Sequence, residues 1–336
     1  MIERIKSHMP FERPLLDFEG RFGESRIDQS FEQRFFDFDD RLYYWTTIYR
    51  YILFLDYDLG TQLMIGIGQK NISNYSVNGV PMEFASDPPE YKVGLSYWYQ
   101  SDELLHITKN EILRNYEDGF ACETLSFRKD IGGYNLKLDE IRTEIHIKEK
   151  WDEDFLQFKS LWTPFYRHNA YFPFEGKILD IESRGVAFIQ KVSLNMPFIP
   201  WRWGRAFFEG GAQLDFYEPR ALVPIFRSLN FQIGDEVYEF KKGTETVMEG
   251  ARGYPRWRVS GRTRGGEEIE ARIASHAHIC QTFETPRTRF SYNEFPSKVV
   301  GLKIKKGRET LYTLDDLGRN AANCEDAHYS KILGNI

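Results

Sequence analysis

Short runs of apolar and aromatic residues recur along the chain, and turn-forming residues separate them at intervals of about ten positions. The clearest run is 141–148, in which Ile or Thr alternates with a charged residue or His. This period of two predicts a strand with one buried face and one polar face. A pair of strands is expected over 41–68, and further strands over 91–100 and 120–128. The pattern therefore predicts a mainly β protein.

A hairpin with its loop at residues 264–266 is the most specific local prediction, because apolar residues lie at odd positions on both sides of two glycines. A three-residue loop pairs Val259 with Ala271 and Trp257 with Ile273, which keeps the apolar side chains on one face. A two-residue loop would place charged residues on that face. The loop also supplies a glycine for the left-handed position that three-residue hairpin loops need.

Three other elements are expected from the same reasoning. A second hairpin around Gly307 joins 299–305 to 309–314. The apolar spacing in 102–117 favours a helix, although it also fits a pair of strands. One short helix is expected in the tail that begins at Asp315.

The chain length bears on the number of domains. Single cores stop growing at about 250 to 300 residues, and this chain has 336. Aromatic residues make up 16% of it, enough ring surface to fill a core, so disorder is excluded. A proline-rich tract at 197–200 interrupts the strand pattern between two β-rich halves. We expect two antiparallel β-barrels packed together, over 1–195 and 196–336, with few short helices; the alternative is one large β domain.

Charge and hydropathy limit the partners and the location of the chain. Lys and Arg number 44 against 50 Asp and Glu, so the chain lacks the basic excess that nucleic-acid binding requires. The most apolar stretch, 48–67, contains three charged residues, and no transmembrane helix is expected. The first residues show no apolar signal segment, so the expected location is the cytoplasm. Peripheral membrane contact and the oligomeric state are left open.

Motifs for cofactors and metals are missing from the sequence. It contains no glycine-rich phosphate loop, no Gly-x-Ser-x-Gly elbow and no His-Glu-x-x-His, and no cofactor is expected. The three cysteines are widely spaced and are expected to be reduced thiols. His276 and His278 would share one face of a strand predicted to run from 269 to 279, and two imidazoles can ligate a metal. No third ligand is identifiable, and a polar strand face explains them without a metal, so no metal site is predicted.

The densest group of unusual residues is the tract 200–205, which reads Pro-Trp-Arg-Trp-Gly-Arg. Indole rings stack against guanidinium groups and stabilise cations, so the tract suits a binding site. The alternative is an Arg–Trp stack that closes one end of a barrel. The candidate ligand-binding residues are Trp201, Arg202, Trp203, Arg205, Tyr217 and Trp257.

A second aromatic tract, 162–176, is interrupted by prolines and suits a loop over the mouth of a cavity. Its candidate ligand-binding residues are Trp162, Tyr166 and His168. The alternative is an aromatic loop that packs beneath its own sheet, with His168 as a hydrogen-bonded spacer.

The run 185–192, the tract 200–205, Gly210–Gly211 and Asp215–Tyr217 together resemble the middle of the lipocalin-like superfamily that includes carotenoid 1,2-hydratases, tocopherol cyclases and AttH-type proteins. The resemblance is most visible over 160–280, and it rests on Trp, Gly and Tyr without a strict catalytic signature. It implies two lipocalin-like (calycin) barrels with an apolar ligand held in or between them. For an enzyme, it implies protonation of an isoprenoid double bond without a cofactor. No acid of that family can be matched to a position of this chain.

The chemistry implied by the resemblance sets requirements for the acid. Protonation of an alkene needs a carboxylic acid that burial keeps neutral, and the carbocation needs aromatic faces and exclusion of water. The acids nearest the aromatic tracts are Asp215, Glu209 and Asp180, which are the candidate catalytic residues. As an alternative, Asp180 and Asp215 could pair with Arg184 or Arg205 at a rim.

Three functions are compatible with these observations. The first is a cofactor-free hydratase, cyclase or isomerase with a hydrophobic substrate in a barrel cavity. The second is a non-catalytic carrier of an apolar ligand, which needs an apolar lining but no buried acid. The third is carbohydrate recognition, which an open aromatic platform would favour and a closed apolar cavity would oppose.

Overall fold

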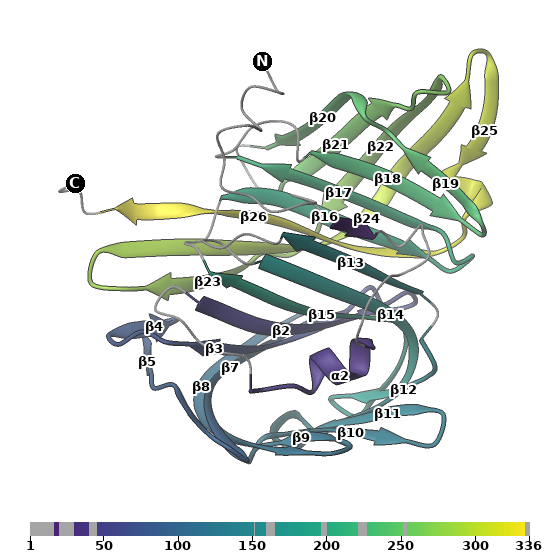
Figure 1. Cartoon of the computed structure of the whole chain (residues 1–336). Coiled ribbons are helices and arrows are strands. Elements are labelled where there is room, and N and C mark those ends of the chain that lie inside the picture. The colour runs from purple at the N-terminus through teal and green to yellow at the C-terminus, as the bar shows by residue number, and fades with distance from the viewer. Residues whose placement is uncertain are drawn as a thin grey trace.

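The computed structural model describes residues 17–19, 30–39, 46–150, 152–158, 165–195, 200–220, 227–250 and 254–332. Within them the chain is almost entirely antiparallel β-structure, arranged in two sheets (Figure 1). The all-β prediction is confirmed. None of the described helices has the length and apolar character needed to span a bilayer.

The first sheet closes into a barrel of ten strands. They pair in the order β14, β12, β11, β10, β9, β8, β7, β3, β2, β15, and β15 pairs back onto β14. Outside this circle, β1 and β13 extend the sheet from β14, and β6 pairs with β7. The bounds are β1 Asp17–Glu19, β2 Thr46–Asp56, β3 Gln62–Lys70, β6 Ala85–Asp87, β7 Glu90–Gln100, β8 Leu104–Tyr116, β9 Gly119–Ala121, β10 Leu125–Asp130, β11 Gly133–Leu138, β12 Thr143–Ile147, β13 Asp152–Phe158, β14 Phe165–Ile178 and β15 Ile181–Asn195.

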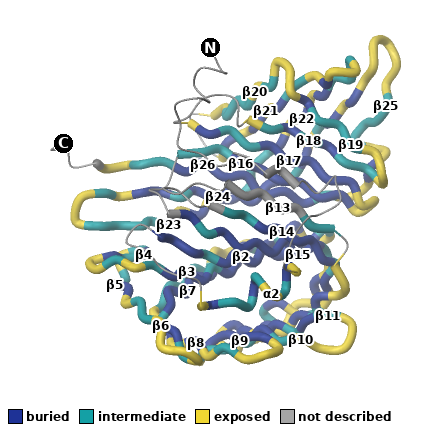
Figure 2. The backbone as a smooth tube through the Cα atoms, viewed as in Figure 1, coloured by how far each residue is buried: buried dark blue, intermediate teal, exposed yellow. Residues whose placement is uncertain are grey.

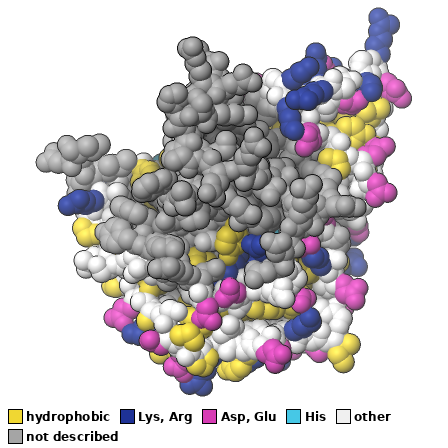
Figure 3. Space-filling view, in the orientation of Figure 1, with side chains coloured by type: hydrophobic (Ala, Val, Ile, Leu, Met, Phe, Trp, Pro, Cys, Tyr) yellow, Lys and Arg dark blue, Asp and Glu magenta, His cyan; other side chains and the backbone are white. Residues whose placement is uncertain are grey.

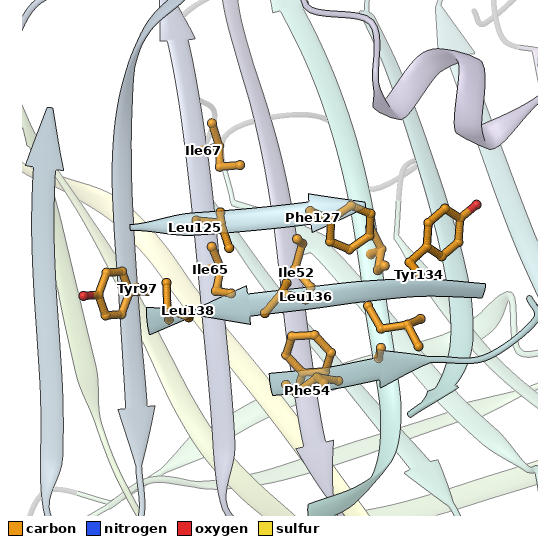
Figure 4. Close-up of a cluster of buried hydrophobic side chains, with 14 of the residues drawn as sticks. Ile52, Phe54, Ile65, Ile67, Tyr97, Leu125, Phe127, Tyr134, Leu136 and Leu138 are labelled. Atoms are coloured by element: carbon orange, nitrogen blue, oxygen red, sulfur yellow. The ribbon is translucent and has the colours of Figure 1, made fainter. Parts of the chain in front are cut away.

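Large apolar side chains fill the barrel interior. Strand alternation turns Ile52 and Phe54 of β2 inward, where they join a core with residues of the other barrel strands (Figure 4). The short helix α2, Phe31–Phe35, lies in the barrel opening and adds its own phenylalanines to that core (Figure 1). Ser30 caps the helix in a reciprocal box with Gln33.

Two buried cations hold the end of this helix inside the barrel. Arg50 and Lys191 are register partners on β2 and β15, and both side chains are buried. Lys191 Nζ donates to the carbonyl oxygens of Arg34 and Asp37 at 2.6 and 2.7 Å, and Arg50 Nε donates to that of Phe35 at 2.6 Å. The carbonyl groups at the helix end are thereby satisfied, which helps to keep α2 in the opening.

The second sheet is open. Its strands run in the order β19, β18, β17, β16, β26, β24, β22, β21, β20, with β25 and β23 also paired to β24. Within the described residues no ladder joins β19 to β20, so the prediction of a second closed barrel is corrected to an open sheet curved over its own core. The bounds are β16 Trp201–Phe208, β17 Gln213–Pro219, β18 Ser228–Ile233, β19 Glu236–Glu239, β20 Lys242–Glu249, β21 Arg256–Arg262, β22 Glu267–Ser275, β23 Ile279–Glu284, β24 Thr288–Lys306, β25 Glu309–Thr313 and β26 Asn320–Ile332.

A hairpin from the first half of the chain joins the second sheet. It consists of β4 Tyr75–Val77 and β5 Val80–Met82, and β4 pairs with β23. Asn78 in its turn bonds to Thr282 of β23 and to Thr108 of β8, so it links the two sheets. The strands on either side of the expected domain boundary are β15, which ends at Asn195, and β16, which begins at Trp201; the boundary itself stays a prediction.

The two sheets pack against each other through their outer faces. Tyr51 and Leu53 of β2, Tyr171 of β14 and Phe188 of β15 contact Trp203 and other residues of the second sheet in one buried cluster. Figure 2 shows that β2 and β16, where the sheets meet, are mostly buried. In Figure 3, acidic and basic side chains are interspersed over the visible, described surface of the barrel. The buried interior of the chain thus comprises the core of each sheet and this contact between the two sheets.

Several local predictions are confirmed. The loop at 264–266 has three residues, because Thr263 N donates to Glu267 O, and β21 pairs Val259 with Ala271 and Trp257 with Ile273. Its Gly266 has a φ of 93°. The hairpin around Gly307 and the alternating burial of β12 are also as predicted. The tail contains a short 3-10 helix, Leu314–Asp316, followed by β26.

Three predictions about local structure are wrong. The strand expected over 120–128 is a hairpin of two short strands, β9 and β10, which pair with each other. Residues 102–117 form no helix: β8 is one long strand that pairs with β7 along its length. Leu104 and Ile112 are apolar residues on the exposed face of this strand. They interrupt the alternation of apolar and polar positions, so the spacing of the apolar residues resembles that of a helix. The strand expected over 269–279 ends at Ser275, so His276 and His278 are not on one strand face.

Candidate functional site

The contact between the two sheets contains a row of side chains on the outer face of the second sheet. Glu294 of β24 lies opposite Glu325 of β26, Glu325 lies opposite Trp203 of β16, and Trp203 lies opposite Tyr217 of β17. These four side chains share one face, because directly paired residues of antiparallel strands point the same way. The barrel strand β2 covers this face with Tyr51. We call the contact around Glu294 and Glu325 the acid site.

Both carboxyl groups of the acid site are buried and hydrogen-bonded. Glu294 is 0% exposed and Glu325 is 4% exposed. Tyr51 Oη donates to Glu294 Oε2 at 3.2 Å, and Trp201 Nε1 donates to Glu325 Oε2 at 2.8 Å. Asn323 Nδ2 also lies 3.4 Å from Glu294 Oε2. The bonds from Tyr51 and Trp201 tie one acid to the barrel and the other to β16.

Burial raises the proton affinity of both acids. It raises the pKa of Glu325 to about 7, against the hydrogen bond from Trp201, which acts in the opposite direction. Burial and the neighbouring Glu325 raise the pKa of Glu294 well above its usual range. Two carboxylates this close do not both ionise readily, so the pair retains at least one proton near neutral pH.

A fixed cation adjoins the acid site. The guanidinium of Arg205 lies 4.2 Å from the ring centre of Phe188, 4.5 Å from Trp203 and 5.2 Å from Tyr171. It pairs with Asp215 at 3.5 Å, and Asp215 accepts a hydrogen bond from Trp203 Nε1 at 2.8 Å. Arg205 also donates to the Tyr171 hydroxyl across the contact between the sheets. These contacts from both sheets hold the guanidinium in one place.

More aromatic residues surround the acids. The ring centre of Trp201 lies 5.8 Å from that of Tyr292 and 5.6 Å from that of Phe290. Burial raises the pKa of Tyr49 strongly and that of Tyr217 to about 12, and the charges of Glu325 and Arg167 act on both hydroxyl groups. These phenols therefore stay neutral near neutral pH and supply hydroxyl groups beside the acids.

The structure brings together five of the residues predicted from the sequence: Trp201, Trp203, Arg205, Asp215 and Tyr217. They lie at alternate positions of β16 and β17, on the face that meets the barrel. The tract 200–205 thus marks the right region. Which of these residues bind a ligand stays a prediction.

The remaining predicted ligand-binding residues lie elsewhere. Arg202 points to the opposite side of β16 and pairs with Asp326 at 3.3 Å. Trp257 is buried in the core of the second sheet, against Phe216 and Phe295. Trp162 lies outside the described residues.

Tyr166 and His168 belong to the barrel side of β14, near α2. His168 is fully buried, with Nε2 3.0 Å from Glu153 Oε2 and its ring edge-on to Phe31. His168 is thus hydrogen-bonded, as in the alternative interpretation, but the described part of the tract is strand β14 and not the loop that the sequence predicted. Tyr166 lies below the charged groups of Arg34 and Lys191.

Two of the three predicted acids lack the burial that their role requires. Glu209 is exposed and pairs with Arg319. Asp180 is exposed and pairs with Arg142 at 2.6 Å, where the sequence suggested Arg184. Only Asp215 is buried, and it pairs with Arg205 as the alternative anticipated.

The sequence reasoning missed Glu294, Glu325, Tyr51 and Tyr292. A signal was present in the tail, where Glu325 directly follows the small, uncharged run 321–324, which is compatible with a buried strand. For Glu294 the signal was its place between Tyr292 and Phe295. Neither position shows by itself that a second sheet covers the acid.

A separate pocket of about 420 Å³ lies at the barrel opening, beside α2. Phe31, Tyr134 and Phe172 form its apolar part, while Glu32 and Lys129, which pair at 2.9 Å, lie at its edge. Over the described part of the chain, no three His, Cys, Asp or Glu side chains are grouped so as to hold a metal ion.

Comparisons with known proteins give matches in structure only. No family model and no curated protein matches the sequence. The chain is similar to an AttH (NE1406) from Nitrosomonas europaea, with 11% identity and a TM-score of 0.44 over 89% of this chain and 96% of that one. It is similar to CghA with Sch210972, with 9% identity and a TM-score of 0.39 over 86% and 89% of the two chains. It is also similar to kievitone hydratase from Nectria haematococca, with 8% identity and a TM-score of 0.41 over 96% and 99%.

One of these structures is an AttH, the type of protein that the sequence resembles. With identities of at most 11% and TM-scores of at most 0.44, they carry no conclusion about activity.

Proposed function

We propose that the chain is a cofactor-free enzyme that moves protons to and from a hydrophobic small molecule where the barrel meets the second sheet. The observation that carries the proposal is the buried Glu294–Glu325 pair, enclosed by aromatic side chains. Hydration, cyclisation and isomerisation all fit, because each delivers one proton to carbon and removes one elsewhere.

The two acids would have different roles in proton transfer. Glu325, with a pKa of about 7, has the proton affinity that suits a group which gives and takes a proton near neutral pH. Glu294 faces Glu325 across the ladder, and burial together with the charge of Glu325 keeps Glu294 protonated. The pair acts as one proton store, as carboxylates that share a site commonly do.

The surroundings support proton transfer to carbon. Trp201, Tyr292 and Tyr51 cover the acids and reduce the access of water, which would otherwise compete for the proton. Arg205 and its partner Asp215 add a fixed charge pair at the edge. An isoprenoid chain is one candidate substrate, and the cytoplasm remains the proposed location.

A carrier function rests on a different observation, the pocket at the barrel opening. Its apolar residues Phe31, Tyr134 and Phe172 could hold an apolar ligand without any chemistry. This second candidate needs no contribution from Glu294 or Glu325. Carbohydrate recognition is not favoured, because Trp98, Trp203 and Trp257 are buried and form no open platform.

The test uses the intact protein in heavy water with a panel of apolar alkenes and unsaturated ketones. Acid–base catalysis places deuterium on carbon, which mass spectrometry detects without knowledge of the natural substrate. The proposal expects incorporation by the wild type and its loss in Glu325→Gln and Glu294→Gln. Glu111→Gln is the matched control, since Glu111 is also a buried glutamate and accepts a hydrogen bond from Thr124 at 2.5 Å. Equal incorporation by all four proteins, or by none, contradicts the proposal.

A further inference from the structure

The charge of the acid site limits which intermediates it can stabilise. Arg205 is 4% exposed, and its guanidinium is permanently protonated. It lies among the rings of Phe188, Trp203 and Tyr171 and bonds to the hydroxyl of the last. The cation is therefore a fixed part of the site rather than a mobile surface group.

Arg205 and Glu325 lie on the same face of the second sheet. Arg205 lies opposite Asn323 on β26, and Glu325 is two residues further along the same face of that strand. Such diagonal neighbours are roughly 7–8 Å apart. The charge of Arg205 also lowers the proton affinity of Glu325, and so acts directly on the acid. A molecule of a few conjugated atoms is long enough to span this distance.

The balance of charge favours a negative intermediate. Arg167 of β14 adds a second guanidinium that acts on Tyr49 and Tyr217 of the same contact. Asp215 offsets the charge of Arg205, while the acid pair retains a proton near neutral pH. A carbocation next to these guanidinium groups would be repelled, whereas negative charge that develops on an oxygen would be stabilised.

We propose that Arg205 binds a carbonyl oxygen of the substrate, and that the reacting double bond is conjugated to this carbonyl. This inference rests on the proposed function and names its substrate class: an apolar α,β-unsaturated carbonyl compound. It replaces the isolated alkene that a carbocation route would need.

A hydration by this route conserves protons and electrons. The oxygen of a water molecule bonds to the β-carbon, and the electrons of the carbon–carbon double bond move to the carbonyl oxygen held by Arg205. Glu325 then gives its proton to the α-carbon as the carbonyl re-forms. The proton that the water loses returns to the Glu294–Glu325 pair, which ends in its initial state. In an isomerisation, the pair removes a proton from one carbon and returns it to another.

The experiment compares two probes of one shape, 4-dimethylaminochalcone, which is an unsaturated ketone, and 4-dimethylaminostilbene, which lacks the carbonyl. Wild type should bind the chalcone roughly tenfold or more tightly than the stilbene, the value of one charge-assisted hydrogen bond. The chalcone absorption band should also move to longer wavelength on binding, because a cation at the oxygen stabilises its charge-separated excited state.

Variants assign the effect to Arg205. Arg205→Met should lose both the preference and the band shift, and Arg205→Lys should keep part of each. Arg272→Met, which removes an exposed arginine paired with Glu270, is the control and should keep both. If Arg205→Met fails to fold with Asp215 left unpaired, Arg205→Met with Asp215→Asn removes the buried pair together.

Equal affinity of wild type for the two probes, absence of binding of both, or a preference that survives in the double variant overturns the inference. The deuterium test judges the proposed function, independently of the probe preference, which judges the substrate class. Incorporation that depends on Glu325 with no preference for the chalcone leaves the proposed function standing and the substrate class wrong. A carbonyl preference without any incorporation contradicts the proposed function instead.

Discussion

Glu294 of β24 and Glu325 of β26 lie directly opposite each other in an antiparallel ladder, and both side chains are buried where the barrel covers the second sheet. Like charges in such directly opposed positions destabilise a sheet. The pair is tolerated because burial and mutual repulsion raise the pKa of Glu294 and keep it protonated. The Glu294–Glu325 pair is thus both part of the contact between the two sheets and the proposed source of protons.

Loss of the acid should reduce turnover strongly. Glu325→Gln keeps the shape of the side chain and an acceptor for Trp201 Nε1, but it cannot exchange a proton. We expect deuterium incorporation to fall by about 10² to 10⁴. A fall of less than about tenfold would show that another group supplies the proton.

The pH dependence of stability should reveal the same group. The pKa of Glu325 is about 7 in the folded chain, whereas a free glutamate side chain has a pKa of 4.5. The folded state therefore binds the proton more tightly, so the contribution to the free energy of unfolding is greatest below about pH 4.5 and is lost as the pH rises to about 7. Urea unfolding of wild type and Glu325→Gln across this range measures it. Parallel curves for the two proteins would contradict the raised pKa.

Trp201 should lower the pKa of Glu325. Its Nε1 donates to Glu325, and this hydrogen bond lowers the pKa of the carboxyl. Trp201→Phe keeps an aromatic ring but removes the donor, so the pKa of Glu325 should rise. Activity that depends on the protonated acid should then persist to higher pH than in the wild type. A pH profile that stays in place, or moves to lower pH, refutes this role.

The three acids suggested by the sequence should behave differently from one another. Glu209→Gln and Asp180→Asn change exposed ion pairs and should alter stability by less than about 1 kcal/mol, with turnover unchanged. Asp215→Asn leaves buried Arg205 without its anionic partner and should cost about 3 kcal/mol. Denaturant midpoints together with deuterium incorporation distinguish these outcomes. Loss of turnover in Glu209→Gln would restore that residue as a candidate acid.

Trp257 should act only through packing. It lies between Phe216 and Phe295 in the core of the second sheet, and Trp257→Ala should cost about 3 to 5 kcal/mol. The relative affinity for the two probes should not change in the protein that remains folded. A changed preference would place this residue near the ligand.

Local patterns predicted the strands better than the site. The parity of apolar positions around residues 264–266 fixed the hairpin register, because a slip by one residue would have turned Trp257 to the other face. The same reasoning failed for β8, where Leu104 and Ile112 are exposed and disturb the alternation. Closure of a sheet depends on pairing between strands far apart in the chain, so the open second sheet could not be read from periodicity.

The acid site depends on contacts between distant segments. Glu325 is a charged residue next to Asp326 in the tail, and it is buried where Trp201 and the barrel pack against β26. The tract 200–205 was recognisable from its composition, and it supplied Trp201, which bonds to that acid. Aromatic composition therefore located the region, while the proton-bearing residues required the structure.

The central claim is that the Glu294–Glu325 pair holds a proton at neutral pH, and infrared difference spectroscopy tests it most directly. A protonated carboxyl group has a C=O stretching band that a carboxylate lacks, and the band shifts in heavy water. Wild type should show this band at about pH 7, and Glu294→Gln combined with Glu325→Gln should remove it. If the wild-type and double-variant spectra are the same in this region, the acids are ionised and the account is wrong.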